Sequence, residues 1–464
     1  MKKVLSVFLI LLFAFSVYGQ DETKKAKKEK KPPKEKVGWR FGGALPATTY
    51  DSNLGFQYGA LFEFFNYGKP SVYPDYLDHT YTEVSRFTKG SGIYRMMYES
   101  NHLIGKTHSS IDISYLPDKA YDFYGFNGYD AVFNKGWMVD EEDGLYKSRM
   151  FYRFERNQFR IKVDIQGKLT GEHIKWSAGL AVNNFTVSSV DIERLNKGKD
   201  AADQLKPLSE VPGLYELYRD SLGLLTKNEA NGGWVNTVKA GIIWDSRDNR
   251  PNPMKGIWTE MGIEYSPKFN DYGWSFAKFY FAHRQYFTLI KDDLSFVYRL
   301  GYQTTLWGDV PFFYQSQVVT SYLTGATNEG LGGSSTLRGV MRSRVIGDGF
   351  LYGNVELRWK PFYFKFLKAD CYLGWNLFYD FGMVTDKISL PSTSELQTSF
   401  NNYLTGYDID DFFKSEAETV HHCVGTSIMF VMNRNFVIAV DIGKAFNAQD
   451  NYKLGFSIGL NYLF

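Results

Sequence analysis

The last eleven residues of the chain, LGFSIGLNYLF (454–464), alternate between large apolar side chains and small or polar ones. Successive side chains of a β-strand point to opposite faces, so Leu454 and every second residue as far as Phe464 share one face. The same alternation recurs along the chain, for example at 374–382 and 435–443, where the second face carries glycines and charged residues. This pattern predicts strands that turn apolar side chains toward hydrocarbon and polar ones toward the inside of a barrel.

Sixteen segments show this pattern, and an even number lets both ends of a barrel chain lie on one side of a membrane. The predicted strands are 37–46, 54–66, 75–87, 91–101, 107–117, 149–166, 172–188, 235–247, 255–267, 273–289, 291–306, 350–361, 371–382, 422–432, 435–445 and 453–464. Short joints on one side alternate with four long connections on the other, 118–148, 189–234, 307–349 and 383–421. We therefore predict an all-β protein, a 16-stranded antiparallel transmembrane β-barrel with long extracellular loops. Helical spacing between Leu214 and Leu225 predicts a surface helix that caps the barrel mouth, with a partner-binding helix as the alternative.

Composition excludes several other classes of protein. Aromatic residues make up 17% of the 464, which is unlike a disordered chain, and no apolar run of about 20 residues follows the first 20 positions. Lys+Arg 53 against Asp+Glu 51 gives a net charge of +2, so we expect no nucleic-acid partner. The two cysteines, Cys371 and Cys423, are too few for a disulfide framework, and we expect no cofactor.

The N-terminal region predicts export. Residues 1–19 contain two lysines and an apolar run from Val4 to Phe15, which is typical of a signal peptide; a short membrane anchor is the alternative. Residues 20–36 (QDETKKAKKEKKPPKEK) predict a disordered, Lys-rich periplasmic tail, which is either simply solvated or a tether to an anionic surface or to a periplasmic partner. Residues 37–464 form the predicted outer-membrane β-barrel, which places the protein in the outer membrane of a Gram-negative bacterium, surrounded by lipid.

One long connection contains the run GLGGSSTLRGV (330–340), in which Arg338 is followed by a glycine. An arginine in such a loop can fold back into the lumen, where its planar fork binds carboxylates through two hydrogen bonds. Two predicted strands carry a carboxylate on the lumen face, Glu356 in NVELR and Asp380 in FYDFG. We expect both to pair with Arg338. The predicted lumen-loop motif comprises Leu337, Arg338, Gly339 and Val340.

This ordered set resembles the outer-membrane assembly-factor superfamily of the BamA/TamA type, the bacterial surface antigen barrel domain. Members carry a Val/Ile-Arg-Gly-aromatic loop followed by strands of the form N-x-E-hydrophobic-R and F-x-D-x-G, which 337–340, 354–358 and 378–382 match in order. A second stretch resembles the D-x-R-D-N…P-x-x-G signature of the family's barrel, here Asp245, Arg247, Asp248, Asn249, Pro253 and Gly256. The aromatic-glycine stretch 123–127 also resembles a family segment.

The resemblance implies a barrel that assists insertion or translocation of outer-membrane or surface components. It also implies a weak seam between the first and last strands, where edge hydrogen bonds can be lent to an incoming strand. Gly455 and Gly459 either loosen that seam or fit beneath bulky lumen neighbours. The residues Leu460, Tyr462 and Phe464 resemble a C-terminal signal for delivery to the assembly machinery.

Two departures from the family pattern stand out. Val340 replaces the usual aromatic residue of the loop, and the tail 20–36 is too short to form a periplasmic POTRA module. Whether a separate protein in the periplasm or outer membrane acts as a partner is therefore an open question. A passive pore or small-molecule transporter with the same fold is the alternative function.

The sequence does not predict an enzyme or a metal site. It contains neither a G-x-S-x-G nor an H-E-x-x-H motif, and we assign no catalytic residue. His421 and His422 beside Cys423 are potential metal ligands, but adjacent histidines on a strand point to opposite faces, which favours a loop-edge role. We expect the turn around Asp245 to be held by its own side chains rather than by a metal.

Overall fold

The structure is a computed structural model that describes residues 37–464 apart from 52–53, 70–71, 73–75, 140–143, 250–251, 269–272, 319–320, 322–329, 367–368, 405, 433–435 and 461–464. The predicted signal peptide (1–19) and Lys-rich tail (20–36) lie outside the described residues. Tyr462 and Phe464 of the predicted C-terminal signal also lie outside them, and Leu460 is the last residue of the final described strand.

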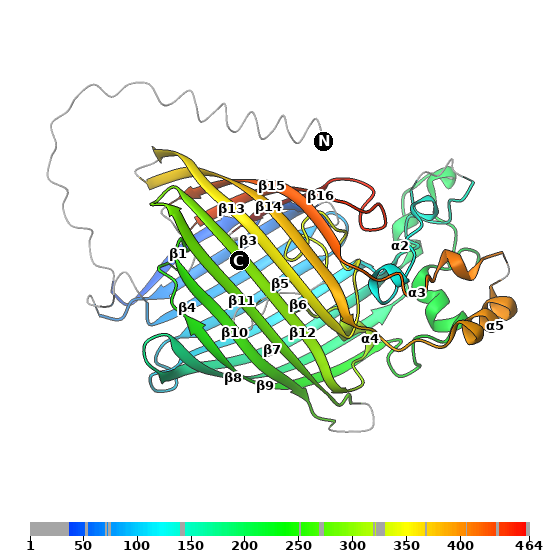
Figure 1. Ribbon diagram of the computed structural model, residues 1–464, viewed down its shortest axis with the longest axis horizontal. Coiled ribbons are helices and arrows are strands. Elements are labelled where there is room, and N and C mark those ends of the chain that lie inside the picture. The colour runs from blue at the N-terminus through cyan, green and yellow to red at the C-terminus, as the bar shows by residue number, and fades with distance from the viewer. Residues whose placement is uncertain are drawn as a thin grey trace.

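Antiparallel strands make up most of the described chain. They are β1 (Trp39–Pro46), β2 (Thr49–Asp51), β3 (Gly55–Asn66), β4 (Asp78–Phe87), β5 (Gly92–Ser100), β6 (His108–Asp122), β7 (Arg153–Thr170), β8 (Ile174–Ser188), β9 (Gly232–Asp245), β10 (Gly256–Ser266), β11 (Phe276–Ile290), β12 (Leu294–Gly308), β13 (Gly349–Phe366), β14 (Ala369–Asp386), β15 (His421–Met432), β16 (Phe436–Ala445) and β17 (Gly455–Leu460). From β3 to β17 each strand pairs with the next, and β17 pairs with β2, so the sheet closes into a barrel (Figure 1). Because β1 and β2 both pair with β3, they are two parts of one strand, and the barrel has 16 strands as predicted.

The first strand differs from its prediction. The predicted segment 37–46 covers β1 but misses β2, the part that closes the barrel against β17. The strand is interrupted after Pro46, which has no backbone N–H to donate, and pairing resumes at Thr49. The polar sequence Thr-Thr-Tyr-Asp therefore carries the closing contact without showing apolar alternation.

Exposure alternates along the strands as the sequence predicts. In β13, Leu357 and Trp359 are 39% and 43% exposed, whereas Glu356 and Arg358 between them are each 2% exposed. The apolar set covers the outside of the barrel and the charged set lies inside, as a membrane-spanning barrel requires.

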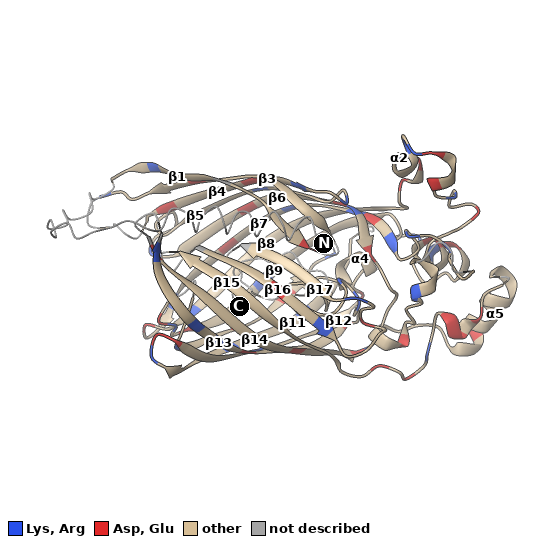
Figure 2. Cartoon of the chain, turned by 90° about the horizontal axis from the view of Figure 1, so that it is seen from above, with Lys and Arg blue, Asp and Glu red and all other residues tan. Residues whose placement is uncertain are grey.

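The four long connections at one end of the barrel, 123–152, 189–231, 309–348 and 387–420, contain all the helices of the described residues. The α-helices are α2 (Ile192–Asn196), α3 (Leu214–Glu216), α4 (Phe312–Gln315) and α5 (Thr393–Tyr403). A π-helical turn spans Leu217–Ser221, and 3₁₀ turns span Gly128–Asp130, Lys135–Trp137, Ala201–Asp203 and Ile409–Asp411. Figure 1 shows the labelled helices gathered at this end, and Figure 2 shows charged residues around α2 and α5. Among the described helices, none is long and apolar enough to cross a membrane.

We call these connections the cap, because they share one aromatic core. The helical turns that begin at Leu214 were predicted to lie on the surface, but Tyr215 is fully buried and Tyr218 is 1% exposed. The Tyr218 ring lies edge-on to Phe123 at 5.4 Å, and the Tyr215 ring stacks on Phe154 at 5.3 Å. The surface prediction is wrong because loops distant in sequence cover all sides of this segment.

Candidate functional site: an arginine cluster inside the barrel

The connection between β12 and β13 contains a buried stretch, Gly330–Ile346, which we call the interior segment. Leu331 and Val345 pair across its base as an antiparallel bridge. Gly332 adopts a φ of 120°, and a Cβ there would lie 2.0 Å from the carbonyl oxygen of Met341, so the fold of the segment requires glycine. Leu337 and Val340 of the predicted motif are buried in one apolar cluster that also includes Phe350 and Tyr352. Val340 therefore packs in this cluster in place of the aromatic residue that is usual at this position of the family motif.

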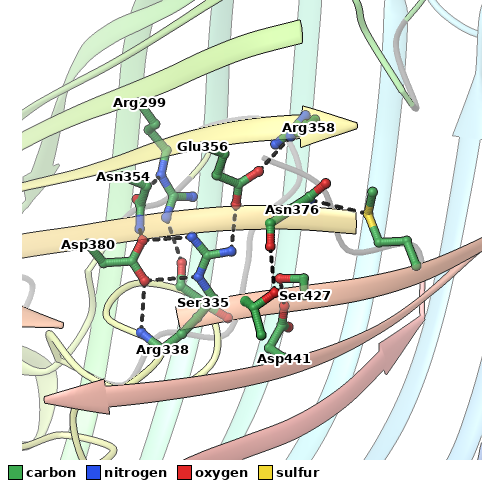
Figure 3. A network of polar contacts seen from close by, with 12 residues as sticks. Arg299, Ser335, Arg338, Asn354, Glu356, Arg358, Asn376, Asp380, Ser427 and Asp441 are labelled. Atoms are coloured by element: carbon green, nitrogen blue, oxygen red, sulfur yellow. Dashed lines mark hydrogen bonds and ion pairs between the residues drawn. The ribbon is translucent and has the colours of Figure 1, made fainter. Parts of the chain in front are cut away.

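Arg338 reaches the two carboxylates that the sequence singled out (Figure 3). Its Nε and Nη2 donate to the two carboxylate oxygens of Asp380 at 2.9 and 2.7 Å, and Nη1 donates to Glu356 Oε1 at 2.5 Å. The backbone N–H of Arg338 donates to Asp380 as well, at 3.1 Å. The guanidinium carbon lies 3.6 Å from the centre of the Phe378 ring, which adds a cation–π contact. All three charged side chains are at least 90% buried.

Neighbouring strands complete the charge balance. Arg358 on β13 donates to the second oxygen of Glu356 at 2.5 Å. Asn354 donates to Asp380 at 2.7 Å and to the Thr336 carbonyl of the interior segment at 2.6 Å. Arg299 on β12 donates to Asn354 at 2.8 Å and to the Ser335 carbonyl at 2.7 Å. The barrel wall thus binds both the arginine side chain and the backbone of the interior segment (Figure 3).

Glycines allow the segment to approach the wall closely. A Cβ on Gly339 would lie 2.6 Å from Cys423 Cβ and 2.8 Å from the carbonyl carbon of Lys444. A Cβ on Gly455, in β17, would lie 2.3 Å from the carbonyl oxygen of Arg338. Of the two interpretations of Gly455, the structure supports the one in which glycine fits beneath a lumen neighbour.

Two further arginines of the interior segment were missed by the sequence analysis. Arg342 donates to Asp118 at 2.6 Å and to Asp122 at 3.0 Å, both on β6. Arg344 donates to the backbone carbonyls of Gly128 and Ala131 in the cap, each at 2.9 Å, and to that of Gln449 at 2.7 Å. The spacing R-x-x-x-R-x-R was the signal available in the sequence. Arg338 contacts β13 and β14, Arg342 contacts β6, and Arg344 contacts the 123–152 connection of the cap, so the segment is bound on several sides.

The predicted signature turn between β9 and β10 is held by its own side chains. Arg247 Nε donates to Asp245 at 2.8 Å, and the guanidinium lies 3.9 Å from the Trp258 ring centre. Asp248 accepts backbone N–H bonds from Asn249, Met254 and Lys255. Pro253 is buried, and Gly256 has a φ of 109°, where an added Cβ would lie 2.3 Å from the Ser246 carbonyl oxygen.

The two adjacent histidines lie on opposite faces of β15. His421 is fully buried between Asp450, at 2.5 Å, and Glu418, at 3.1 Å, and its ring stacks on Tyr129 at 3.8 Å. His422 contacts the outward-facing Tyr379 hydroxyl at 3.2 Å. Within the described part of the chain, no group of His, Cys, Asp and Glu side chains is arranged to hold a metal ion.

Comparison with known proteins identifies the family. The Omp85 superfamily domain matches residues 103–463, which is most of the chain. The chain belongs to the Omp85 superfamily. This confirms the resemblance drawn from the motifs, and the described residues of this Omp85 protein contain no POTRA-like region.

Solved structures show the same fold. The Omp85 barrel is similar to BamA from Haemophilus ducreyi lacking POTRA domains 1–3, with a TM-score of 0.52 and 13% identity over 91% of this chain and 70% of that chain. It is also similar to CdiB from Escherichia coli, with a TM-score of 0.50 and 9% identity over 89% of this chain and 62% of that chain. No curated protein sequence matches the chain. The identities are low, so these likenesses concern the fold.

Proposed function

We propose that this Omp85 barrel lies in the outer membrane of a Gram-negative bacterium and assists insertion or translocation of outer-membrane or surface components, without catalysing a chemical reaction. Lipid surrounds it, and a separate periplasmic or outer-membrane protein supplies substrate capture. One observation carries this proposal beyond family membership, namely the weak closure of the barrel.

Within the residues that the structure describes, which leave out 52–53 and 461–464, the closing contact between the first and last strands is short. Among the described residues, β17 and β2 are joined through two residue pairs, Ser457 with Asp51 and Ile458 with Tyr50. On its other side, β17 shares six residue pairs with β16. Between these described residues few backbone hydrogen bonds have to break to separate β17 from β2, and the freed edges can then pair with an incoming strand.

The interior segment supports assembly over the alternative of a passive pore. Three arginines, at 338, 342 and 344, hold the segment across the barrel, and a steady pore needs that path to be open. We propose that the segment closes the lumen while the seam works at the side of the barrel. Conductance in planar bilayers distinguishes the two functions, since a steadily open wild-type pore supports the transporter.

A disulfide across the seam tests the proposal directly. Tyr50 and Ile458 are opposite one another, and paired antiparallel residues have Cα atoms about 4.5–5.5 Å apart, which suits a disulfide. The matched control links Ile263 to Phe279, which are opposite in β10 and β11. The native thiols of Cys371 and Cys423 are buried and do not compete.

We expect oxidised Y50C/I458C to lower the surface level of other barrel proteins in cells that depend on this chain, and reduction to restore it. The oxidised control pair should behave as wild type. Full activity with the seam disulfide formed would reject a role for seam opening.

A further inference from the structure

A cavity of about 220 Å³ lies between the interior segment and the wall formed by the ends of β4 to β7. Its wall side includes Arg156 and Gln158 of β7, and its inner side includes Ser334, Ser335 and Arg342 of the interior segment. A space of this size holds several water molecules or one small polar ligand. None of the family motifs identified in the sequence contributes to it.

Arg156 is a buried cation without a counter-ion among the described residues. It is 5% exposed, and its Nε and Nη2 are buried with no hydrogen-bond partner within the residues that the structure describes. The guanidinium lies between two rings, 4.7 Å from the centre of Tyr121 and 4.9 Å from that of Phe185. Aromatic rings fix the position of the guanidinium but accept no hydrogen bond in its plane, so its donors remain unsatisfied.

The carboxylate opposite Arg156 on the neighbouring strand already has hydrogen-bond partners. Asp118 is opposite Arg156 in the pairing of β6 with β7. Its Oδ2, however, accepts from Arg342 at 2.6 Å, and its Oδ1 accepts from Ser91 at 2.8 Å and from the Ala120 N–H at 3.1 Å. The interior segment thus occupies the acidic group that would otherwise pair with Arg156.

Charge is unbalanced around the cavity. Arg342 bridges Asp118 and Asp122, and Arg153 donates to Asp122 at 3.2 Å. Arg153 and Arg342 thus pair with these two carboxylates and Arg156 with neither, and the cavity lining holds two guanidiniums, of Arg156 and Arg342, against the one carboxylate of Asp118. Arg156 and Arg342 also lie over the same Tyr121 ring, Arg342 at 5.1 Å from its centre. An isolated buried charge is costly, so an anion in the cavity would stabilise this arrangement.

We propose that this cavity binds a phosphate-class oxyanion, held by the planar fork of Arg156 on the wall and by the hydroxyl-bearing residues Ser334 and Ser335 of the interior segment. The guanidinium fork matches the spacing of two oxygens of a phosphate. Because its partners come from both the wall and the segment, the anion fastens the segment on the side of the barrel away from Asp380 and Glu356. The site does not depend on the proposed assembly function.

The test uses the purified full chain in detergent micelles, titrated with inorganic phosphate at constant ionic strength set with chloride. We expect saturable phosphate binding by calorimetry and a rise in the unfolding temperature that follows it, because a ligand that binds only the folded state stabilises that state. Arg156→Gln should weaken phosphate binding at least about tenfold, the equivalent of losing one charge-assisted hydrogen bond. The control Arg194→Gln removes a cap arginine paired with Glu155 and should bind phosphate as wild type does.

Without phosphate, Arg156→Gln should unfold at a higher temperature than wild type, because it removes an unpaired buried charge. A purely structural role for the stacked guanidinium predicts the opposite, a lower unfolding temperature that phosphate does not alter. If the glutamine variant does not fold, Arg156→Lys keeps the charge, loses the fork and should bind phosphate about tenfold more weakly.

The source of the phosphate is determined separately, by measuring lipid phosphorus that remains with the purified wild-type and variant chains. Retained lipid phosphorus that is lost in Arg156→Gln assigns the site to a lipid headgroup, and binding of inorganic phosphate alone assigns it to the free ion. Equal phosphate binding by wild type and Arg156→Gln overturns the proposal. So does a wild-type chain that neither binds inorganic phosphate nor retains lipid phosphorus.

Discussion

Replacing Arg338 with alanine tests how firmly the ion pairs hold the interior segment. The substitution removes two side-chain hydrogen bonds to Asp380 and one to Glu356, together with the cation–π contact to Phe378. Glu356 keeps its ion pair with Arg358. Asp380 keeps the amide of Asn354 and the backbone N–H of residue 338 but loses its cation. The uncompensated charge therefore falls on Asp380.

The expected cost is set by that buried carboxylate. Removing one partner of a buried ion pair typically costs about 3–5 kcal/mol, and we expect a value near the lower end because Asp380 retains three neutral donors, the third being the Cys423 thiol at 3.8 Å. Adding Asp380→Asn to Arg338→Ala removes the stranded charge. The double variant should therefore be more stable than Arg338→Ala alone, which distinguishes electrostatics from lost packing.

Urea unfolding in detergent micelles measures these differences, with heat-modifiable gel mobility as a second readout of the folded barrel. The control is Lys365→Ala, which breaks an exposed ion pair with Asp370 and should cost about 0–1 kcal/mol. The reasoning is refuted if Arg338→Ala unfolds at the same urea concentration as wild type, or if the double variant is less stable than the single one.

Three other substitutions test separate parts of the structure. Trp375→Asp places a charge on the lipid face, where the native ring is 46% exposed, and should cost about 2–4 kcal/mol at the bilayer midplane and less toward an interface, measured by unfolding from lipid vesicles; an unchanged stability would contradict the assignment of that face. Gly339→Ala inserts a Cβ against Cys423 and the backbone of Lys444 and should cost about 1–3 kcal/mol, whereas Gly144→Ala, with open space around it, should be neutral; equal effects of the two in urea unfolding would argue against close approach of the segment. Burial raises the pKa of Glu216, in the cap, above its ordinary value of 4.5. The protonated Glu216 side chain therefore contributes stability that is fully present below pH 4.5 and is lost as the pH rises through the raised pKa. The stability of Glu216→Gln relative to wild type should therefore increase with pH across that window, and a pH-independent difference would show that the carboxyl is not buried in solution.

The strands were predictable because their signal is local. A side chain that faces lipid must be apolar and its neighbour must suit a wet interior, so period-two alternation places a strand such as β13 from its own residues. The exception is β2, whose polar residues close the barrel beside Ser457. The pairing of β2 with β17 follows from closure of the barrel, and neither strand has a local sequence pattern that indicates it.

The cap was not predictable from the same signal. Its residues read as long loops, and the segment after Leu214 reads as an amphipathic surface helix. The aromatic core instead joins residues as distant as Phe123, Tyr218 and Phe412. Burial there depends on which loops meet, and local spacing carries no information about that.

The chain's own residues determined the barrel, its strand number and the pairing partners of Arg338, since a buried guanidinium needs carboxylates and the lumen faces of the strands supply Glu356 and Asp380. Only the tertiary structure decided the rest of the interior. It paired Arg342 with Asp118 and Asp122, and so left Arg156 without an acidic partner in the part of the chain that the structure describes. The path of the folded interior segment brings Arg342 to the carboxylates of β6, and local residue spacing carries no information about that path.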